Sequence, residues 1–235
     1  MKKFRIEKDV FEKHPNYCVG VVVARGIDNK ILNKKIEDFL DNAINDFATN
    51  KKEANIRELV SPYREAFYAL NINPNKFMCS IEALLKRVQK GNSFPHINTI
   101  VDLGNAFSIK YEIPLGVHDI DKLEGDLEVR FSKENDTFLP LGEAELEKMP
   151  AGELVYASLN TIKTRRWIWR QSNDGKIEKT TQNIFFPIDG FKGINDRQVL
   201  KLRDELVAFL TSELGCKDVE TGFVDKENNE FIINE

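Results

Sequence analysis

The spacing of apolar residues along the chain predicts a set of amphipathic helices. Between residues 33 and 48, apolar side chains recur at helical intervals while lysines and aspartates occupy the opposite face. Segment 80–91 repeats this pattern, with a serine suited to cap its start and a glycine suited to end it. The clearest helix, at 196–214, follows an asparagine cap and ends before a glycine. Shorter helical segments are predicted at 51–60 and 63–70.

Short apolar runs rich in β-branched and aromatic residues predict strands around these helices. The run at 17–24 is typical of a buried strand in the middle of a sheet. Further strands are predicted at 127–131, 153–157, 162–171 and 181–188, and an Asp-Gly turn joins the last two. We expect the polar tail at 216–235 to add an edge hairpin or to be partly mobile.

The order of these elements predicts the fold class. A strand and helices come first, strands and hairpins follow, and a helix comes near the end. This order favours an α/β (α+β) fold, a layered sandwich of mixed sheets with helices. A chain of 235 residues with 41% hydrophobic content can form one substantial core, so we expect a single domain spanning 1–235.

Composition narrows the classes of function. The 34 basic and 38 acidic residues give a formal charge of −4, so any nucleic-acid contact must come from a local patch. The three cysteines are far apart and form no Cys-x-x-Cys pair, which argues against a disulfide framework and a zinc site. The charged N-terminus and the absence of a long apolar run predict a cytoplasmic protein without a membrane partner.

The segment at 96–107 carries three polar residues at helical spacing. Asn98, Asp102 and Asn105 lie four and three positions apart in the largely helical run at 96–107, so they share one helical stripe. Such residues can serve a site, or they can cap the helix and bridge to a loop.

The turn-rich segment at 113–126 places His118 among acidic residues. An imidazole there can serve chemistry near neutral pH, or it can simply bond to a neighbouring aspartate. The acidic spacing lacks the pattern of a calcium loop, so a solvated turn is expected and no metal site is predicted.

Residues 163–170 combine cations with both tryptophans of the chain. This stretch holds Lys163, Arg165, Arg166 and Arg170 and no acidic residue. Guanidinium groups beside indoles can stack on a base and pair with phosphate. Alternatively, one tryptophan belongs to the core and the arginines pair with the acidic turn at 119–128.

Residues 77–190 resemble the B3/B4 module of the bacterial phenylalanyl-tRNA synthetase beta subunit. The matching motifs are Ile-Asn at 97–98, Val-Asp-Leu at 101–103, Pro-Leu at 114–115 and Asp-Lys-Leu-Glu-Gly at 121–125. The resemblance continues to Thr-Thr-Gln-Asn-Ile at 180–184, whereas 165–171 is more like stand-alone proteins built on this module. It implies a layered arrangement of sheets and helices.

In that family the module hydrolyses mischarged tyrosyl-tRNA, and the resemblance implies a comparable site here. The family places its editing histidine directly after Pro-Leu, a position that is Gly116 in this chain, and His118 follows two residues later. The family's later glycine-rich segment with its glutamate is replaced by 167–172. The candidate catalytic pair is therefore His118 with Asp102. The candidate substrate-binding residues are Asn98, Arg165, Arg166, Trp167, Trp169, Arg170 and Asn183.

Three hypotheses for function follow from these residues. In the first, the chain recognises tRNA, the acceptor end of an aminoacyl-tRNA or a free amino acid, with or without hydrolysis of a mischarged ester. The arginines would hold phosphate or carboxylate, and the tryptophans would form the pocket wall. In the second, it binds an aromatic amino acid or another small anion without chemistry. The third is a protein-interaction domain. No cofactor is expected, because the sequence has no Walker loop or dinucleotide fingerprint, and complete aminoacylation is not expected.

Overall fold

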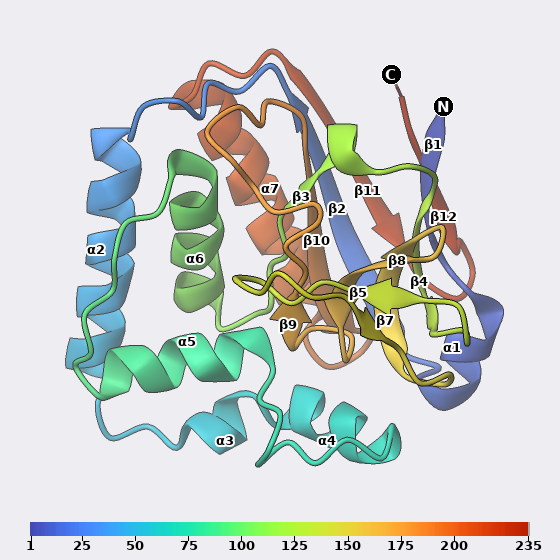
Figure 1. The fold of residues 1–235 in the computed structure, drawn as a ribbon. Helices are drawn as coiled ribbons and strands as arrows, with labels where there is room; N and C mark the ends of the chain where they lie inside the picture. Colours follow the sequence, from blue (N-terminus) through green and yellow to red (C-terminus); the bar gives the residue numbers. More distant parts are fainter. Residues whose placement is uncertain (235) are drawn as a thin grey trace.

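The computed structural model describes residues 1–234 as a layered α/β fold built on two β-sheets (Figure 1). The helices are α1 (Lys8–Lys13), α2 (Lys34–Asn50), α3 (Ile56–Leu59), α4 (Ser61–Ala69), α5 (Ser80–Gln89), α6 (Thr99–Tyr111) and α7 (Asp196–Ser212). The strands are β1 (Lys2–Ile6), β2 (Tyr17–Arg25), β3 (His118–Asp119), β4 (Leu127–Phe131), β5 (Thr137–Phe138), β6 (Glu147–Lys148), β7 (Leu154–Ser158), β8 (Thr161–Arg165), β9 (Arg170–Gln171), β10 (Ile184–Phe191), β11 (Asp218–Val224) and β12 (Glu230–Ile233). The predicted fold class is confirmed.

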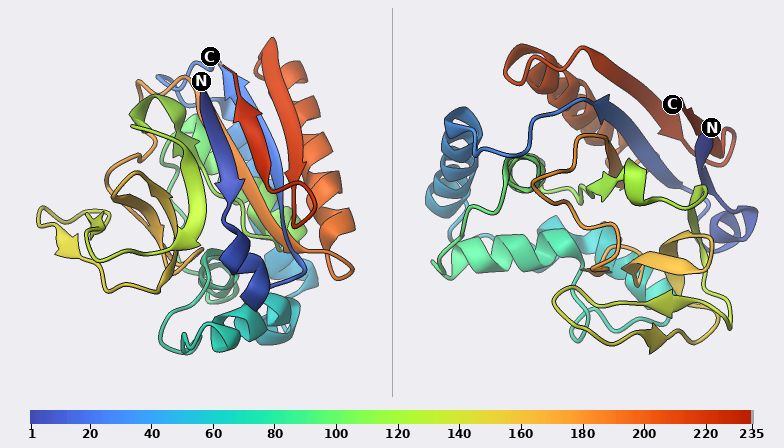
Figure 2. Two further views of the ribbon diagram at one scale, coloured as in Figure 1. Left: turned by 90° about the vertical axis from the view of Figure 1, so that its right-hand side faces the viewer. Right: turned by 45° about the horizontal axis from the view of Figure 1, so that its top comes forward.

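The smaller sheet has the strand order β11-β2-β10-β3 and lies in the centre of the molecule. Its strands pair antiparallel, and β10 is buried along its whole length. Alternate residues face opposite layers, as the two-residue period of a strand requires. On one face, Val22 and Phe186 pack with apolar residues of α6 and α7. On the other, Val21 and Phe185 pack with the larger sheet, so helices and sheets form successive layers (Figure 2).

The larger sheet follows the order β12-β1-β4-β7-β8-β5-β6, and β9 pairs with β8. It is mixed, because β1 with β4 and β5 with β8 are parallel while its other pairs are antiparallel. The predicted tail hairpin takes a different form, since β11 joins the smaller sheet and β12 joins the larger one. Among residues 1–234, no helix has the length and apolar character that a membrane crossing requires.

The predicted strand at 162–171 is interrupted. Strand β8 ends at Arg165, and the backbones of Arg166 and Trp167 adopt positive φ angles of 47° and 60°. Two successive left-handed residues cannot continue a β-strand, so the chain turns before β9. The prediction of one continuous strand at 162–171 is therefore wrong. The turn sends the Trp167 side chain into the core, where it is almost completely buried.

Candidate functional site

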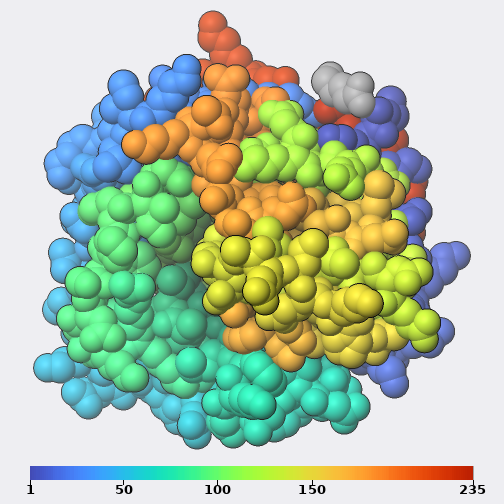
Figure 3. Space-filling view, viewed as in Figure 1, coloured from blue at the N-terminus to red at the C-terminus, as the bar shows by residue number. Residues whose placement is uncertain are grey.

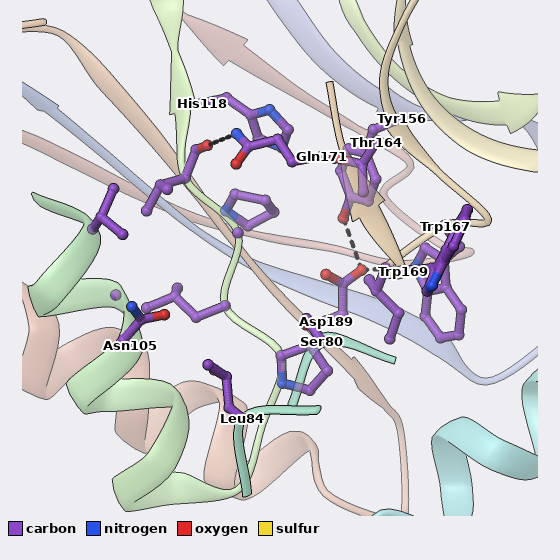
Figure 4. A pocket seen from close by; sticks show the side chains of 18 residues that line it. Ser80, Leu84, Asn105, His118, Tyr156, Thr164, Trp167, Trp169, Gln171 and Asp189 are labelled. Carbon is purple, nitrogen blue, oxygen red and sulfur yellow. Dashed lines mark hydrogen bonds between the residues drawn. The ribbon is translucent and has the colours of Figure 1, made fainter. Parts of the chain in front are cut away.

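A cavity of about 230 Å³ lies between helices α5 and α6 and the strands of the two sheets (Figure 4). In the space-filling view, a hollow separates the α5–α6 region from the segment near residue 140 (Figure 3). We call this cavity the central pocket. Its lining residues are Ser80, Leu84, Val101, Gly104, Asn105, Pro114, Leu115, Gly116, Val117, His118, Tyr156, Thr164, Trp167, Ile168, Trp169, Gln171, Pro187 and Asp189.

Backbone contacts hold one wall of the central pocket in place. The amide of Gly116 donates a hydrogen bond of 2.8 Å to the carbonyl of Pro187, which fixes the chain before β3 against β10. A Cβ atom on Gly104 would lie 3.2 Å from Cγ1 of Val117, so this glycine allows α6 to approach the same wall closely. The side-chain amide of Gln171 donates to the carbonyl of Val117 at 2.8 Å. Elements from both sheets and from α6 therefore define the pocket's width.

Asp189, in β10, supplies the one carboxylate that residues 1–234 contribute to the pocket lining. Its Oδ1 atom accepts hydrogen bonds from the hydroxyl groups of Tyr17 at 2.5 Å and Tyr156 at 2.7 Å, and from Nε1 of Trp167 at 2.9 Å. The other oxygen, Oδ2, points away from Tyr156 and Trp167 (Figure 4). Burial raises the pKa of Asp189 from 3.8 to about 6, although the three donors act in the opposite direction. At neutral pH this side chain is mainly a carboxylate.

His118, in β3, is 3% exposed, and its ring is stacked against the ring of Tyr156 with 5.5 Å between centroids. Its Nδ1 atom is buried without a hydrogen-bond partner among residues 1–234. Burial, and to a smaller extent the charge of Lys163, lowers the pKa of His118 to about 3. The imidazole is therefore neutral at physiological pH, with one donor and one acceptor nitrogen.

The described lining of the central pocket lacks the positive charge that we expected from the arginines at 165–170. No lysine or arginine belongs to its lining within the described part of the chain, and Asp189 is the charged group there. Most of the remaining lining is apolar, with single polar groups such as Ser80, Asn105 and Thr164. Such a pocket favours a neutral or cationic group and disfavours a free anion.

Three of the nine predicted site residues, His118, Trp167 and Trp169, line the central pocket. The arginines lie outside its lining and pair with glutamates after β5. Arg165 bonds to Glu147 at 2.7 Å and Glu153 at 2.9 Å. Thus the predicted role of this guanidinium in holding phosphate or carboxylate inside the pocket is not supported, because carboxylates of the chain already neutralise it.

The other two arginines are also engaged by the protein. Arg166 lies over the ring of Phe77 at 3.8 Å and that of Trp169 at 4.5 Å, and it pairs with Glu153 at 3.4 Å. Arg170 lies 3.7 Å from Glu143. The arginines therefore pair with glutamates at 143–153. The alternative in which they pair with the acidic turn at 119–128 is wrong.

Asp102 makes no hydrogen bond with His118, so the expected catalytic pair does not form. One oxygen of Asp102 contacts Nδ1 of His96 at 2.9 Å, and the other accepts from the amide of Ile97 at 2.9 Å. Asn98 accepts from the amide of Val101 at 3.0 Å. Both residues thus stabilise the start of α6, where the first amides lack intrahelical partners.

Asn183 also lies outside the central pocket. Its side-chain amide donates to both oxygens of Asp121 at 3.0 Å, and its oxygen accepts from the amide of Gly26. From the predicted stripe of α6, Asn105 does reach the pocket. The pocket residues that the sequence analysis missed include Tyr156, Gln171 and Asp189. An aspartate inside the otherwise apolar strand at 184–191 is the signal that could have indicated Asp189, because a buried carboxylate needs a specific reason.

Comparisons with known proteins place the chain in a family. The profile of the B3/4 domain matches residues 62–210. The phenylalanine–tRNA ligase beta subunit of Fusobacterium nucleatum is 31% identical over 102 residues, and that of Mycoplasma pneumoniae is 30% identical over 124 residues. These alignments cover 43% and 52% of this chain, and the chain spans only 12% and 15% of the relatives' lengths.

A solved structure gives a further comparison. A crystal structure of an N-terminal fragment of the phenylalanyl-tRNA synthetase beta subunit from Pyrococcus horikoshii aligns with a TM-score of 0.48 and 11% sequence identity. The alignment covers 92% of this chain and 49% of that one. The profile match extends over more than half of the 235 residues and includes every residue of the central pocket. The chain therefore belongs to the B3/4 domain family.

Proposed function

We propose that the central pocket binds the aminoacyl end of an aminoacyl-tRNA and that the domain hydrolyses the ester of a mischarged tRNA. Membership of the B3/4 family and similarity to phenylalanine–tRNA ligase beta subunits support this reading. The observation that carries it is the charge of the pocket, which combines one carboxylate and one neutral imidazole with no lining cation among the described residues.

This charge distinguishes an esterified amino acid from a free one. A free amino acid brings a carboxylate into the pocket, where it meets the carboxylate of Asp189 and no lysine or arginine among the described lining residues. In an aminoacyl ester the carboxyl group carries no charge, so only the amine remains charged. The pocket is therefore electrostatically matched to the ester form, and free amino acids bind more weakly.

The size of the central pocket agrees with an aminoacyl ligand. Its volume of about 230 Å³ is below that of pockets for drug-sized ligands, which begin at about 300 Å³. The aminoacyl group fills such a space, and the terminal adenosine remains at the mouth. The apolar lining, which includes Trp167 and Trp169, suits a hydrophobic or aromatic side chain.

His118 is the candidate catalytic residue. A Cβ atom on Gly116 would lie 3.5 Å from Nε2 of His118, so the imidazole reaches the region where a side chain at position 116 would begin. This proximity supports a role for His118 like that of the histidine which the resembling synthetases carry after Pro-Leu. In the proposed reaction, water attacks the ester carbonyl carbon while His118 accepts a proton. The bond to the ribose oxygen then breaks, and the proton passes to that oxygen to complete the hydroxyl.

A second candidate function is binding without hydrolysis. Catalytic imidazoles are generally oriented by a third group, yet Nδ1 of His118 has no partner among residues 1–234. Asp102, the residue expected to orient it, is bonded to His96 instead. Under this alternative, the domain retains the aminoacyl ester and leaves it intact.

Deacylation of a panel of correctly charged and mischarged tRNAs tests the proposal. We expect the wild-type protein to accelerate the release of at least one mischarged amino acid. His118→Ala should reduce that rate by about 100-fold or more, whereas His96→Gln, which changes a histidine outside the pocket, should retain it. If wild-type protein accelerates no deacylation but binds an aminoacyl-tRNA, the second function is supported. If it neither deacylates nor binds, both candidates fail.

A further inference from the structure

Asp189 differs from the other buried aspartates in its hydrogen bonding. Within residues 1–234, the buried aspartates are Asp102, Asp119, Asp136, Asp189 and Asp225. In all of these except Asp189, both carboxylate oxygens have partners within the protein. At Asp189, all three side-chain donors bond to Oδ1, and no described residue donates to Oδ2.

Asp136 shows how this protein satisfies a carboxylate with a structural role. It is as buried as Asp189, and the guanidinium of Arg130 bonds to its two oxygens at 2.7 and 2.9 Å. A buried carboxylate without a cation is unfavourable, because desolvation penalises its charged form. No cation among the described residues pairs with Asp189, and its unbonded oxygen belongs to a residue that lines the central pocket. The missing partner is therefore expected to come from the ligand.

We propose that Oδ2 of Asp189 is the receptor for a protonated primary amine of the ligand. An ammonium group supplies both the missing donor and the missing positive charge, and an ionised pair with a hydrogen bond is the strong form of this contact. The inference rests on the proposed function, since both place the ligand in the central pocket, and it extends that function to the chemical group recognised there.

The hydrogen-bond network keeps this receptor in position. Tyr17 belongs to β2 and Tyr156 to β7, so the two hydroxyl groups anchor Asp189 to both sheets. The indole of Trp167 supplies the third bond from the left-handed turn after β8. Because Oδ1 is held by three donors, the carboxylate cannot rotate without breaking them, and Oδ2 stays available to the pocket.

The same network relates the receptor to His118. The ring of Tyr156 is stacked with His118 while its hydroxyl group contacts Asp189. A small ligand can therefore reach both groups at once. In an aminoacyl ester the α-amine is attached to the carbon next to the carbonyl, so amine recognition at Asp189 would position the ester. An amine on the side chain, as in lysine, provides the same chemistry and is a second source.

Binding of amide-linked aminoacyl-adenosine analogues, which cannot be hydrolysed, tests the inference by calorimetry. The probes are alanyl, phenylalanyl and tyrosyl compounds with a free or an acetylated α-amine. A further lysyl compound has an acetylated α-amine and a free side-chain amine. We expect acetylation to weaken binding to wild-type protein by about 10-fold or more. If the lysyl compound recovers the affinity, a side-chain amine is recognised; if it does not, the α-amine is.

Two variants complete the experiment. Asp189→Asn preserves the shape and an acceptor for the three donors, and it should abolish the difference between free and acetylated probes. Asp28→Asn removes the same charge from an exposed position outside the pocket and should preserve the difference. If Asp189→Asn does not fold, the comparison of free and acetylated probes on wild-type protein still decides. Equal affinity for free and acetylated probes, with no stronger binding of the lysyl compound, overturns the amine receptor alone. No binding of any probe overturns the proposed function as well.

Discussion

The hydroxyl group of Tyr156 donates a hydrogen bond of 2.7 Å to Asp189, and through this bond a single residue of β7 connects the two groups on which the central pocket depends. The ring of Tyr156 stacks against the ring of His118, while its hydroxyl group holds the carboxylate of Asp189 in place. His118 is held neutral and Asp189 is mainly ionised at neutral pH. The pKa of His118 is lowered and that of Asp189 is raised, so the aspartate has the higher pKa of the two. Strongly shifted pKa values of neighbouring groups are typical of functional sites.

Replacing Tyr156 by phenylalanine should weaken the ionised form of Asp189. The variant retains the stacked ring but removes one of the three donors, so the pKa of Asp189 should rise above about 6. We expect a loss of about 1 kcal/mol in the free energy of unfolding and weaker binding of an amine ligand at pH 7. Urea unfolding and calorimetry measure these quantities, with Tyr68→Phe, at an exposed position, as control. An unchanged pH dependence of binding would contradict the assigned role of the hydroxyl.

Asp189→Asn should stabilise the fold at neutral pH even though it removes ligand recognition. The pKa of Asp189 is raised in the folded protein, so the native state binds the proton more tightly than the unfolded state. Wild-type stability therefore falls as pH rises from 3.8 to about 6. The neutral variant avoids this loss, which is at most roughly 3 kcal/mol. Urea unfolding at pH 8 and pH 4 checks the prediction. A variant less stable than wild type at pH 8 would show that the charge is needed for folding.

Binding of an amine ligand should have a bell-shaped pH dependence. On the acid side, affinity should fall as pH drops below about 6 and Asp189 becomes protonated. On the alkaline side, it should fall as an α-amine loses its proton near about pH 7.7. Several titratable groups around Asp189 have pKa values shifted out of this range, namely Tyr17, Tyr63 and Tyr156 upward, Cys18 to about 12, and His118 to about 3. Burial lowers the pKa of His14 from 6.5, so His14 is the neighbouring group that the acetylated control must account for.

Calorimetry between pH 5 and pH 9 measures this profile, and the acetylated ligand provides the control. Its affinity should change little over the same range, because it carries no amine charge. An acid limb for both ligands would mean that protonation alters the pocket itself and does not act through a charged pair.

Removing single arginines should leave the binding of an aminoacyl-adenosine analogue unchanged. Arg165 and Arg170 pair with glutamates and lie outside the pocket lining. The Arg170–Glu143 pair is exposed and contributes little, so Arg170→Gln should alter stability by less than about 1 kcal/mol. Arg165→Gln should cost more stability, because it removes a partner of the largely buried Glu153. Calorimetry with the analogue, which lacks the phosphates of tRNA, checks the result. A large loss of affinity in either variant would return these arginines to the site.

Local sequence patterns were sufficient for helices α2, α5 and α7, which have a clear apolar periodicity, and for the central strand β2, which is a continuous apolar run. They were insufficient where distant segments meet. The turn at Arg166 and Trp167 depends on Glu153, which accepts a hydrogen bond from the amide of Arg166 at 3.3 Å. Propensity within 162–171 contains no information on this partner, so the stretch was predicted as one strand.

The candidate site shows the same limit. The sequence indicated that both tryptophans and His118 belong to a shared site, and the structure brings these three together. The pairing of Asp102 with His96 instead of His118 is set by the connection before α6, which a helical stripe does not describe. Asp189 was missed because its donors come from Tyr17 and Tyr156, far away in the sequence, and because β10 is otherwise apolar.

The chain's two tryptophans offer the most direct measurement of the central claim, since both Trp167 and Trp169 line the central pocket. In a proton–nitrogen correlation spectrum, the indole N–H groups of these two residues give two signals, and both signals report on the pocket. The account predicts that an amide-linked aminoacyl-adenosine shifts both signals in a saturable way. The corresponding free amino acid, at the same concentration, should leave both in place. Unchanged indole signals with the aminoacyl-adenosine, or shifts produced equally by the free amino acid, would contradict the assignment of this pocket to an aminoacyl ester.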